Sequence, residues 1–100
     1  MKTIHVVPHQ HFDIVWRRSI NWYIRRRKEI YIQAIELLEK NPEFTFSFSQ
    51  AYILREFLEN NPSFKKQISS LLKSGRLEIV GGLESIPDLN ISSAAAIVRN

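Results

Sequence analysis

The sequence predicts an α/β fold, a parallel β-α-β-α-α-β segment that opens a larger α/β barrel or open sheet. Strand-like segments and amphipathic helical segments alternate along the chain. Strands that are separated by helices pair in parallel through right-handed crossovers. Three such strands leave both sheet edges open, so we expect the 100 residues to form one part of a larger domain.

The first half of the chain predicts a strand, a polar loop and a long helix. Lys2–Val7 is rich in β-branched residues and ends at Pro8, which has no N–H to donate to a ladder. A histidine-rich loop follows. Apolar residues then recur at helical spacing over Ile20–Lys40, with Arg27 as an interruption, and Asn41-Pro42 ends the helix.

The second half adds two strands and two or three helices. Aromatic and hydroxyl residues alternate over Phe44–Ser49 with the period of a strand. Helical spacing returns over Gln50–Asn60 and Ser63–Lys73, and Gly75 supplies the stop. The remaining elements are a third strand at Arg76–Val80, ended by Gly81-Gly82, and the start of a helix within Ser92–Asn100.

Composition limits the class of protein. Hydrophobic residues make up 44% and charged residues 24%, as in soluble globular chains. The chain contains no cysteine, which excludes disulfides and thiolate metal ligands. No apolar run approaches the roughly 18 residues of a membrane span, and the first residues resemble a signal peptide poorly. A cytoplasmic location without membrane contact is the default expectation.

Positive charge is concentrated in one segment. The net charge is +4, and six of the fourteen Lys and Arg residues lie in Arg17–Lys28. Such a cluster attracts phosphates or an acidic partner, or it forms a solvated helix face. The second interpretation is favoured, because Glu29, Glu36 and Glu39 follow on the same segment.

The loop after the first strand carries metal-binding residue types. His9, His11 and Asp13 alternate, so an extended backbone directs all three to one side. Imidazole nitrogen and carboxylate oxygen suit Zn²⁺, and also Mn²⁺ or Co²⁺. Trp16 follows at a fixed offset and offers an apolar platform for a sugar ring. Taken singly, Asp13 could cap a helix and Trp16 could belong to a core. Their conjunction favours a metal site.

These residues resemble a known signature. Val6–Trp16, which reads VVPHQHFDIVW, is similar to the His-x-His-x-Asp-x-x-Trp motif that opens the catalytic domain of glycoside hydrolase family 38 α-mannosidases. The stretch Gly75–Gly82 followed by Pro87–Asn90 resembles the third-strand region of that family. The similarity covers residues 1–100, which would form the incomplete amino-terminal portion of an irregular β/α barrel.

The resemblance implies specific roles. His11 and Asp13 match two zinc ligands, one Zn²⁺ occupying each complete site, and Trp16 matches the aromatic residue that packs on mannose. His9 matches a signature histidine that is not a ligand. The family uses a retaining mechanism, in which one carboxylate attacks the anomeric carbon and another serves as acid and base. The nucleophilic aspartate is expected beyond this chain, so no catalytic residue is assigned here.

Two later polar residues remain open to more than one interpretation. Gln50 follows the second strand and either faces the pocket or starts the next helix. Asp88 either contacts substrate or metal, or forms a turn. The chain also departs from the family at Leu83–Ser85, where members often carry an aromatic residue. At Ser92–Ile97 it lacks the usual Ser-Gly-Glu.

The sequence therefore predicts the amino-terminal fragment of a zinc-dependent retaining α-mannosidase. Its partner would be a mannose-containing carbohydrate, with no nucleic acid, and the fragment alone is expected to be inactive. The alternatives are a metal-dependent carbohydrate deacetylase and a non-catalytic module that binds through the basic helix. The oligomeric state and the mannose linkage do not follow from the sequence.

Overall fold

The longest element, α1 (Ile20–Lys40), is defined by polar residues at both ends. The computed structural model describes residues 1–81, 84 and 92–99. Ser19 precedes α1 with an extended backbone, and its hydroxyl oxygen accepts a hydrogen bond of 3.3 Å from the Trp22 N–H. At the other end, the Asn41 side-chain amide donates to the Leu37 carbonyl at 2.9 Å. The predicted bounds of this helix are confirmed.

One face of α1 is buried over its whole length. The buried residues follow the three- and four-residue spacing of a helix face: Tyr23, Arg27, Tyr31, Ala34, Ile35 and Leu38. Arg27, which interrupts the apolar pattern of the sequence, lies in this face and is 1% exposed. The interruption is therefore a buried charge, which requires a partner.

The remaining elements follow in the predicted order. They are β1 (Phe46–Phe48), α2 (Ala51–Asn60), a short 3₁₀ turn η1 (Pro62–Phe64), α3 (Lys65–Lys73), β2 (Leu77–Ile79) and α4 (Ala94–Arg99). Gly75 ends α3 with a positive φ of 74°, a conformation that glycine adopts without steric cost. Both strands are shorter than their sequence patterns.

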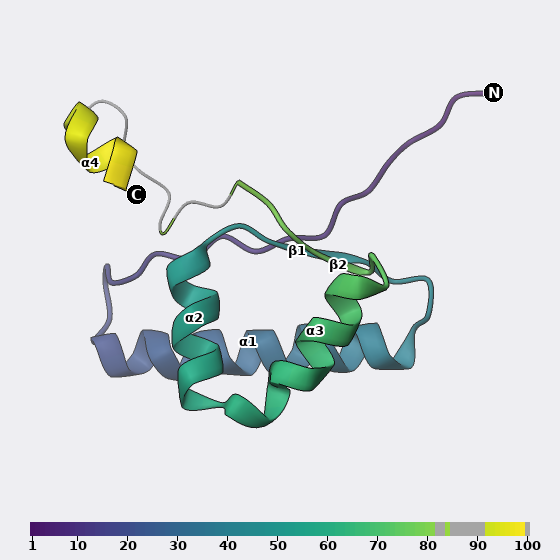
Figure 1. Ribbon diagram of the computed structural model, residues 1–100, viewed down its shortest axis with the longest axis horizontal. Coiled ribbons are helices and arrows are strands. Elements are labelled where there is room, and N and C mark those ends of the chain that lie inside the picture. Colours follow the sequence, from purple (N-terminus) through teal and green to yellow (C-terminus); the bar gives the residue numbers. More distant parts are fainter. Residues whose placement is uncertain (82–83, 85–91, 100) are drawn as a thin grey trace.

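The two strands form a parallel sheet (Figure 1). Phe46 lies opposite Leu77 and Phe48 opposite Ile79. The ladder extends one bond beyond each end, since the Phe46 N–H donates to the Arg76 carbonyl at 3.0 Å and the Val80 N–H to the Phe48 carbonyl at 2.9 Å. The α2–α3 pair connects the strands, as the predicted crossover requires.

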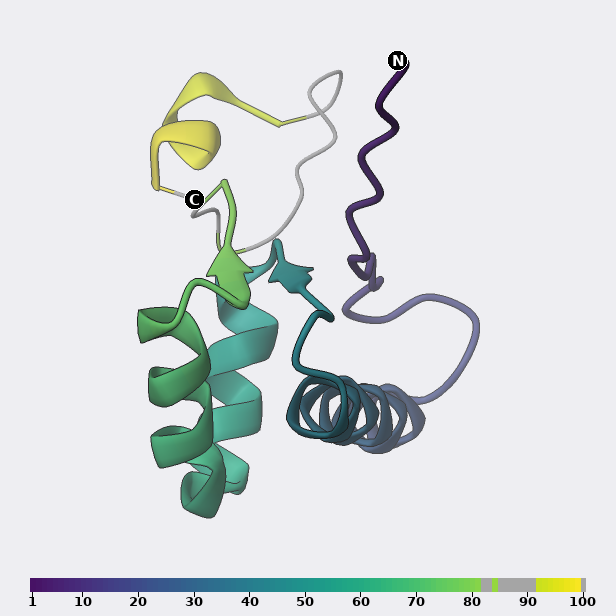
Figure 2. The ribbon, with the colours of Figure 1, turned by 90° about the vertical axis from the view of Figure 1, so that its right-hand side faces the viewer.

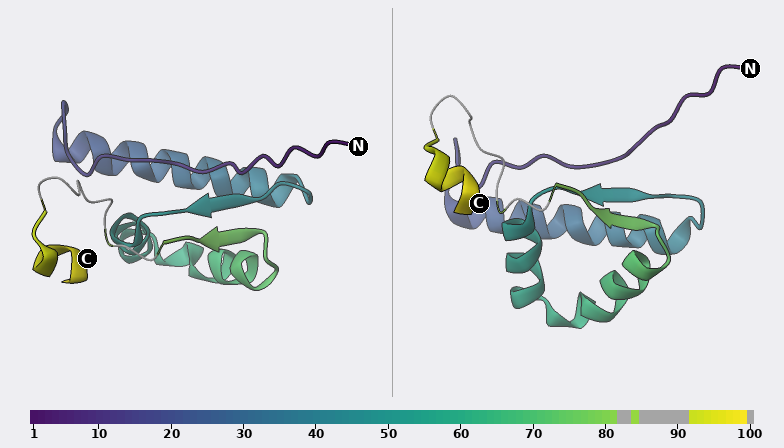
Figure 3. Two further views of the ribbon diagram at one scale, coloured as in Figure 1. Left: turned by 90° about the horizontal axis from the view of Figure 1, so that it is seen from above. Right: turned by 45° about the horizontal axis from the view of Figure 1, so that its top comes forward.

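The predicted first strand at Lys2–Val7 is wrong. Pairing is confined to a parallel bridge between His9 and Ser47, with the Ser47 N–H donating to the Pro8 carbonyl at 3.0 Å. In this register, residues before His9 would lie beside residues before Phe46, where the chain is still turning out of α1. The segment therefore has no strand to pair with and extends away from the other elements (Figures 1 and 3).

The helices α1, α2 and α3 lie on the same side of the two strands (Figure 2). Between them, the ring of Tyr31 stacks on Phe48 with centroids 4.2 Å apart, and Phe57 meets Tyr31 edge-on. The core cluster consists of Tyr31, Ile35, Leu38, Phe48, Ile53, Leu54, Phe57, Ile68, Leu71 and Leu77. The described residues thus form an open α/β sheet, and its closure into a barrel remains a prediction.

Candidate metal centre

The loop that carries the predicted ligands alternates between solvent and core. His9, His11 and Asp13 are exposed, whereas the residues between them are half-buried. Phe12 packs against the core cluster. Because successive side chains of an extended backbone point to opposite sides, the burial of Phe12 directs His11 and Asp13 outward together.

His11 and Asp13 form an exposed pair of side chains that could coordinate a metal ion. His11 Nε2 lies 4.0 Å from Asp13 Oδ1, and the two side chains are 58% and 48% exposed. Two ligands that share a tetrahedral Zn²⁺ at about 2.1 Å lie about 3.4 Å apart, so the pair must close by roughly half an ångström. The donor chemistry fits zinc, and the adjustment is within reach of exposed side-chain rotations.

The described residues bring together two predicted ligands and not a full set. Among residues 1–81, 84 and 92–99, no group of three or more His, Asp or Glu side chains gathers closely enough to hold a metal ion. A zinc site needs three or four protein ligands. Further ligands would therefore have to come from outside the described part of the chain.

His9 and Trp16 lie beside this pair in the sequence and are also exposed. His9 Nδ1 lies 3.3 Å from the Gln10 carbonyl oxygen, a contact within its own loop. The Trp16 side chain is 66% exposed, with the Arg17 guanidinium 4.4 Å from its ring centroid. Residues 14–18 form bends, so the helical turn that would place Asp13 and Trp16 on one face is absent there.

The structure decides the cap alternative for Asp13 and leaves Asp88 untested. Ser19, and not Asp13, caps α1, which leaves the Asp13 carboxylate available. Asp88, the second predicted substrate-binding residue, lies outside the described residues, as does Leu83. The ligand and substrate roles of His11, Asp13, Trp16 and Asp88 stay predictions.

Gln50 has a role that neither interpretation of the sequence anticipated. It precedes α2, but its side chain makes no cap hydrogen bond. Instead, its Oε1 accepts from the Phe12 N–H at 3.0 Å, and its Nε2 donates to the Phe12 carbonyl at 2.8 Å. Gln50 is 4% exposed. Its position after a strand was visible in the sequence, whereas its partner 38 residues earlier was not.

Buried side chains of α1 hold the same loop from another side. Arg27 Nη1 donates to the Ile14 carbonyl at 2.9 Å and more weakly to the Asp13 carbonyl at 3.4 Å, while its Nη2 forms a two-point ion pair with Glu56. The Tyr23 hydroxyl accepts from the Arg17 N–H at 3.3 Å. The sequence signal for the ion pair between Arg27 and Glu56 was a charged residue at a position of the apolar face of the helix.

The basic cluster on α1 is smaller than its sequence suggests. Arg27 is buried, and Arg26 pairs with Glu29 at 3.0 Å, so the positive face loses two of its four consecutive cations. This arrangement favours the solvated-face interpretation over a binding surface. Among the described helices, none is long and apolar enough to cross a bilayer.

Comparisons with known proteins agree with one another. The family model for the glycosyl hydrolases family 38 N-terminal domain matches residues 1–100. Human alpha-mannosidase 2C1 is 33% identical over 97 residues, which cover 97% of this chain and 9% of that protein. The alpha-mannosidase of Canavalia ensiformis is 32% identical in an alignment of 90 residues, which covers 79% of this chain and 9% of that protein.

Solved structures give the same result. A crystal structure of an alpha-mannosidase from Enterococcus faecalis V583 superposes with a TM-score of 0.68 at 29% identity, covering 73% of this chain and 8% of that chain. A second Enterococcus faecalis protein, described as a member of glycosyl hydrolase family 38, shares the fold with a TM-score of 0.69 at 24% identity, over 82% of this chain and 10% of its own. The chain spans about a tenth of the length of the relatives it matches.

Proposed function

The chain belongs to glycosyl hydrolase family 38, and from that membership we propose that it is the amino-terminal segment of a zinc-dependent retaining α-mannosidase. The substrate class is a terminal α-mannoside of a glycan or oligosaccharide. The observation that carries the proposal is the approach of His11 Nε2 and Asp13 Oδ1 to 4.0 Å on the exposed side of a loop anchored by Phe12.

Three exposed residues of the loop have a part in this proposal. His11 and Asp13 hold the metal ion, for which Mn²⁺ or Co²⁺ is an alternative to Zn²⁺. When bound, the ion supplies a Lewis acid that orients mannose hydroxyl groups. The Trp16 ring presents an apolar surface to the C–H face of the sugar. The attacking carboxylate is expected beyond this chain, and no residue of the chain is assigned as the acid/base carboxylate.

The two alternative functions have less support. A metal-dependent carbohydrate deacetylase would use similar donors, but the family matched is one of glycosidases. A module that binds nucleic acid through the basic helix would need its cations free, whereas Arg27 is buried against Glu56.

The proposal is tested in the parent enzyme, meaning the complete hydrolase to which this chain corresponds. We expect it to release the aglycone from an aryl α-mannoside, with the α-anomer of mannose as the first product in an NMR time course. We expect His11→Ala to lower kcat at least about a hundredfold and to reduce bound zinc. His5→Ala, which alters an exposed histidine outside the loop, is the matched control.

Activity on β-mannosides alone, or full zinc content in His11→Ala, would reject the proposal. The isolated 100-residue chain is expected to be inactive in the same assay, because its two donors are an incomplete ligand set and the nucleophile is elsewhere.

A further inference from the structure

The backbone of Phe12, which lies between the two predicted ligands, is held by a side chain from a distant part of the chain. Gln50 binds both the N–H and the C=O of Phe12, at 3.0 Å and 2.8 Å. Residue 12 is flanked directly by His11 and Asp13. Because β1 ends at Phe48, Gln50 supplies through its side chain the two hydrogen bonds that a neighbouring strand would give.

A side-chain carboxamide can make both of these hydrogen bonds at once, because its oxygen and nitrogen lie in one plane. It carries a donor and an acceptor side by side, which match the acceptor and donor of a single residue's backbone. Gln50 is 4% exposed, so water cannot replace it at low cost. A side chain without the amide would leave both polar groups of Phe12 without this partner.

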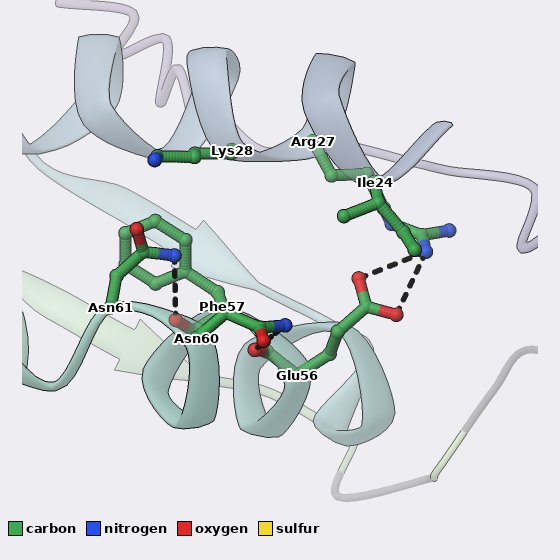
Figure 4. A pocket seen from close by; sticks show the side chains of 7 residues that line it. All are labelled: Ile24, Arg27, Lys28, Glu56, Phe57, Asn60 and Asn61. Carbon is green, nitrogen blue, oxygen red and sulfur yellow. Dashed lines mark hydrogen bonds and ion pairs between the residues drawn. The ribbon is translucent and has the colours of Figure 1, made fainter. Parts of the chain in front are cut away.

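The other side of the loop is fixed through an ion pair. Arg27 reaches from α1 to Glu56 on α2, and the two carboxylate oxygens lie 2.9 Å and 3.0 Å from its Nη2 (Figure 4). Its second terminal nitrogen, Nη1, donates to the carbonyls of Asp13 and Ile14. The side chain of Arg27 is 2% exposed and that of Glu56 15% exposed. The Arg27–Glu56 ion pair therefore connects α1, α2 and the loop.

We propose that Gln50 and Arg27 are positioning residues for the metal site, and that they fix the backbone from Phe12 to Ile14 so that His11 and Asp13 reach one ion. This proposal rests on the proposed function, because it requires His11 and Asp13 to be metal ligands. Gln50 and Arg27 contact the loop through its backbone, and neither is proposed as a ligand of the metal or the sugar. Each acts by limiting the orientations of the ligand side chains, as the supporting partners of metal ligands do.

The test measures zinc affinity of the parent enzyme by competition with a chromophoric chelator, at a temperature where each variant is folded. Gln50→Met keeps the length of the side chain and removes both hydrogen bonds. The double variant Arg27→Met with Glu56→Leu removes this ion pair and its contacts with the loop without leaving a buried charge unpaired. We expect each to weaken zinc binding by about 10- to 100-fold and to alter the absorption spectrum of the Co²⁺-substituted enzyme.

Two controls separate positioning from general destabilisation. Ile68→Ala shortens a buried side chain of α3 that cannot hydrogen-bond to the loop, and it should lower the melting temperature with zinc affinity unchanged. His11→Ala tests the ligand assignment itself. If His11→Ala keeps its zinc, the proposed function fails.

If His11→Ala loses zinc while Gln50→Met and the double variant both bind it as tightly as the wild type, the positioning role alone is overturned. Unchanged affinity in one of them removes that residue from the proposal. If Gln50→Met does not fold, the double variant still decides whether the loop is positioned from α1.

Discussion

At the scale of single residues, two buried polar side chains of the described core hold another part of the chain. Arg27 and Gln50 are almost fully buried, and both donate hydrogen bonds to the loop from Phe12 to Ile14. Replacing either by an apolar residue would leave buried backbone or carboxylate groups without a hydrogen-bond partner. The polar residues of this core therefore connect stability to the geometry of the candidate metal centre.

Tyr31 is a buried polar residue of a different kind. Its hydroxyl makes no hydrogen bond within the described part of the chain, and its ring is completely buried. Burial raises the pKa of Tyr31 well above its ordinary value, an effect that the Gln10 side chain and the positive Arg27 partly oppose. The folded protein thus keeps this phenol neutral at a pH where an unfolded chain would ionise it.

The raised pKa predicts a loss of stability in alkali. Below about pH 10 the neutral phenol is present in both states, and stability is unaffected. As the pH rises further, the unfolded chain releases the proton first, so the folded state loses stability. Tyr31→Phe should remove this component and change stability by no more than about 1 kcal/mol at neutral pH.

Thermal unfolding of the parent enzyme between about pH 8 and about pH 11 measures this effect. Tyr52→Phe, which removes the hydroxyl of a half-buried tyrosine, is the matched control. An equal alkaline decline in the wild type and in Tyr31→Phe would show that the Tyr31 hydroxyl does not contribute.

At this scale, the sequence indicated the donors and not their support. The alternation of His11, Phe12 and Asp13 is a local property, and it predicted the shared orientation that the structure has. The contacts of Gln50 and Arg27 with the loop depend on how β1 and α1 pack against it. Spacing within a segment does not encode a partner that lies 38 positions away.

At the scale of elements, one side chain joins the end of α1 to the start of β2. Arg76 Nη2 donates to the carbonyls of Leu38, Asn41 and Phe44, the last two at 2.6 Å and 3.3 Å. The last carbonyls of a helix have no partner within it and carry its negative dipole end. The Arg76 guanidinium satisfies one of them, that of Leu38, and fixes the turn that leads into β1 through the carbonyls of Asn41 and Phe44.

Removing this contact should loosen the end of α1. We expect Arg76→Met to lower the local opening free energy of the last turn of α1 and of β1 by about 2 kcal/mol, because charge-assisted hydrogen bonds are lost. Native-state hydrogen exchange of the parent enzyme measures it. Arg25→Met, an exposed substitution on the same helix, should stay within about 0.5 kcal/mol of the wild type. Equal protection in both variants would contradict the role of Arg76.

Helices were easier to predict than strands for a physical reason. The hydrogen bonds of α1 are internal, so the apolar spacing and the polar ends of its own sequence define it. A strand also requires a neighbour. Lys2–Val7 has the composition of a strand, yet it remains unpaired because the chain beside it is still leaving α1.

At the scale of the whole molecule, the chain has the features of one part of a larger domain. Its radius of gyration is 15.1 Å, compared with about 13 Å for a compact domain of this length. Ile4, Val6 and Val7 are largely exposed on the extended segment, and Ile79 on β2 is 41% exposed. Exposed apolar residues of this kind are expected to be paired or packed in the parent enzyme.

Whether the candidate metal site is complete depends on the whole catalytic domain and not on this chain alone. The chain positions two donors at one edge of its sheet, and the remaining ligands and the nucleophile would arrive from later strands of the same fold. The central claim is therefore that His11 and Asp13 converge on one ion when the whole catalytic domain is present.

Anomalous X-ray scattering at the zinc edge, recorded from crystals of the parent enzyme, tests that claim most directly. We predict a single strong peak about 2.0–2.2 Å from both His11 Nε2 and a carboxylate oxygen of Asp13. A peak bound by other residues, with the His11 and Asp13 side chains turned away from it, would contradict the account.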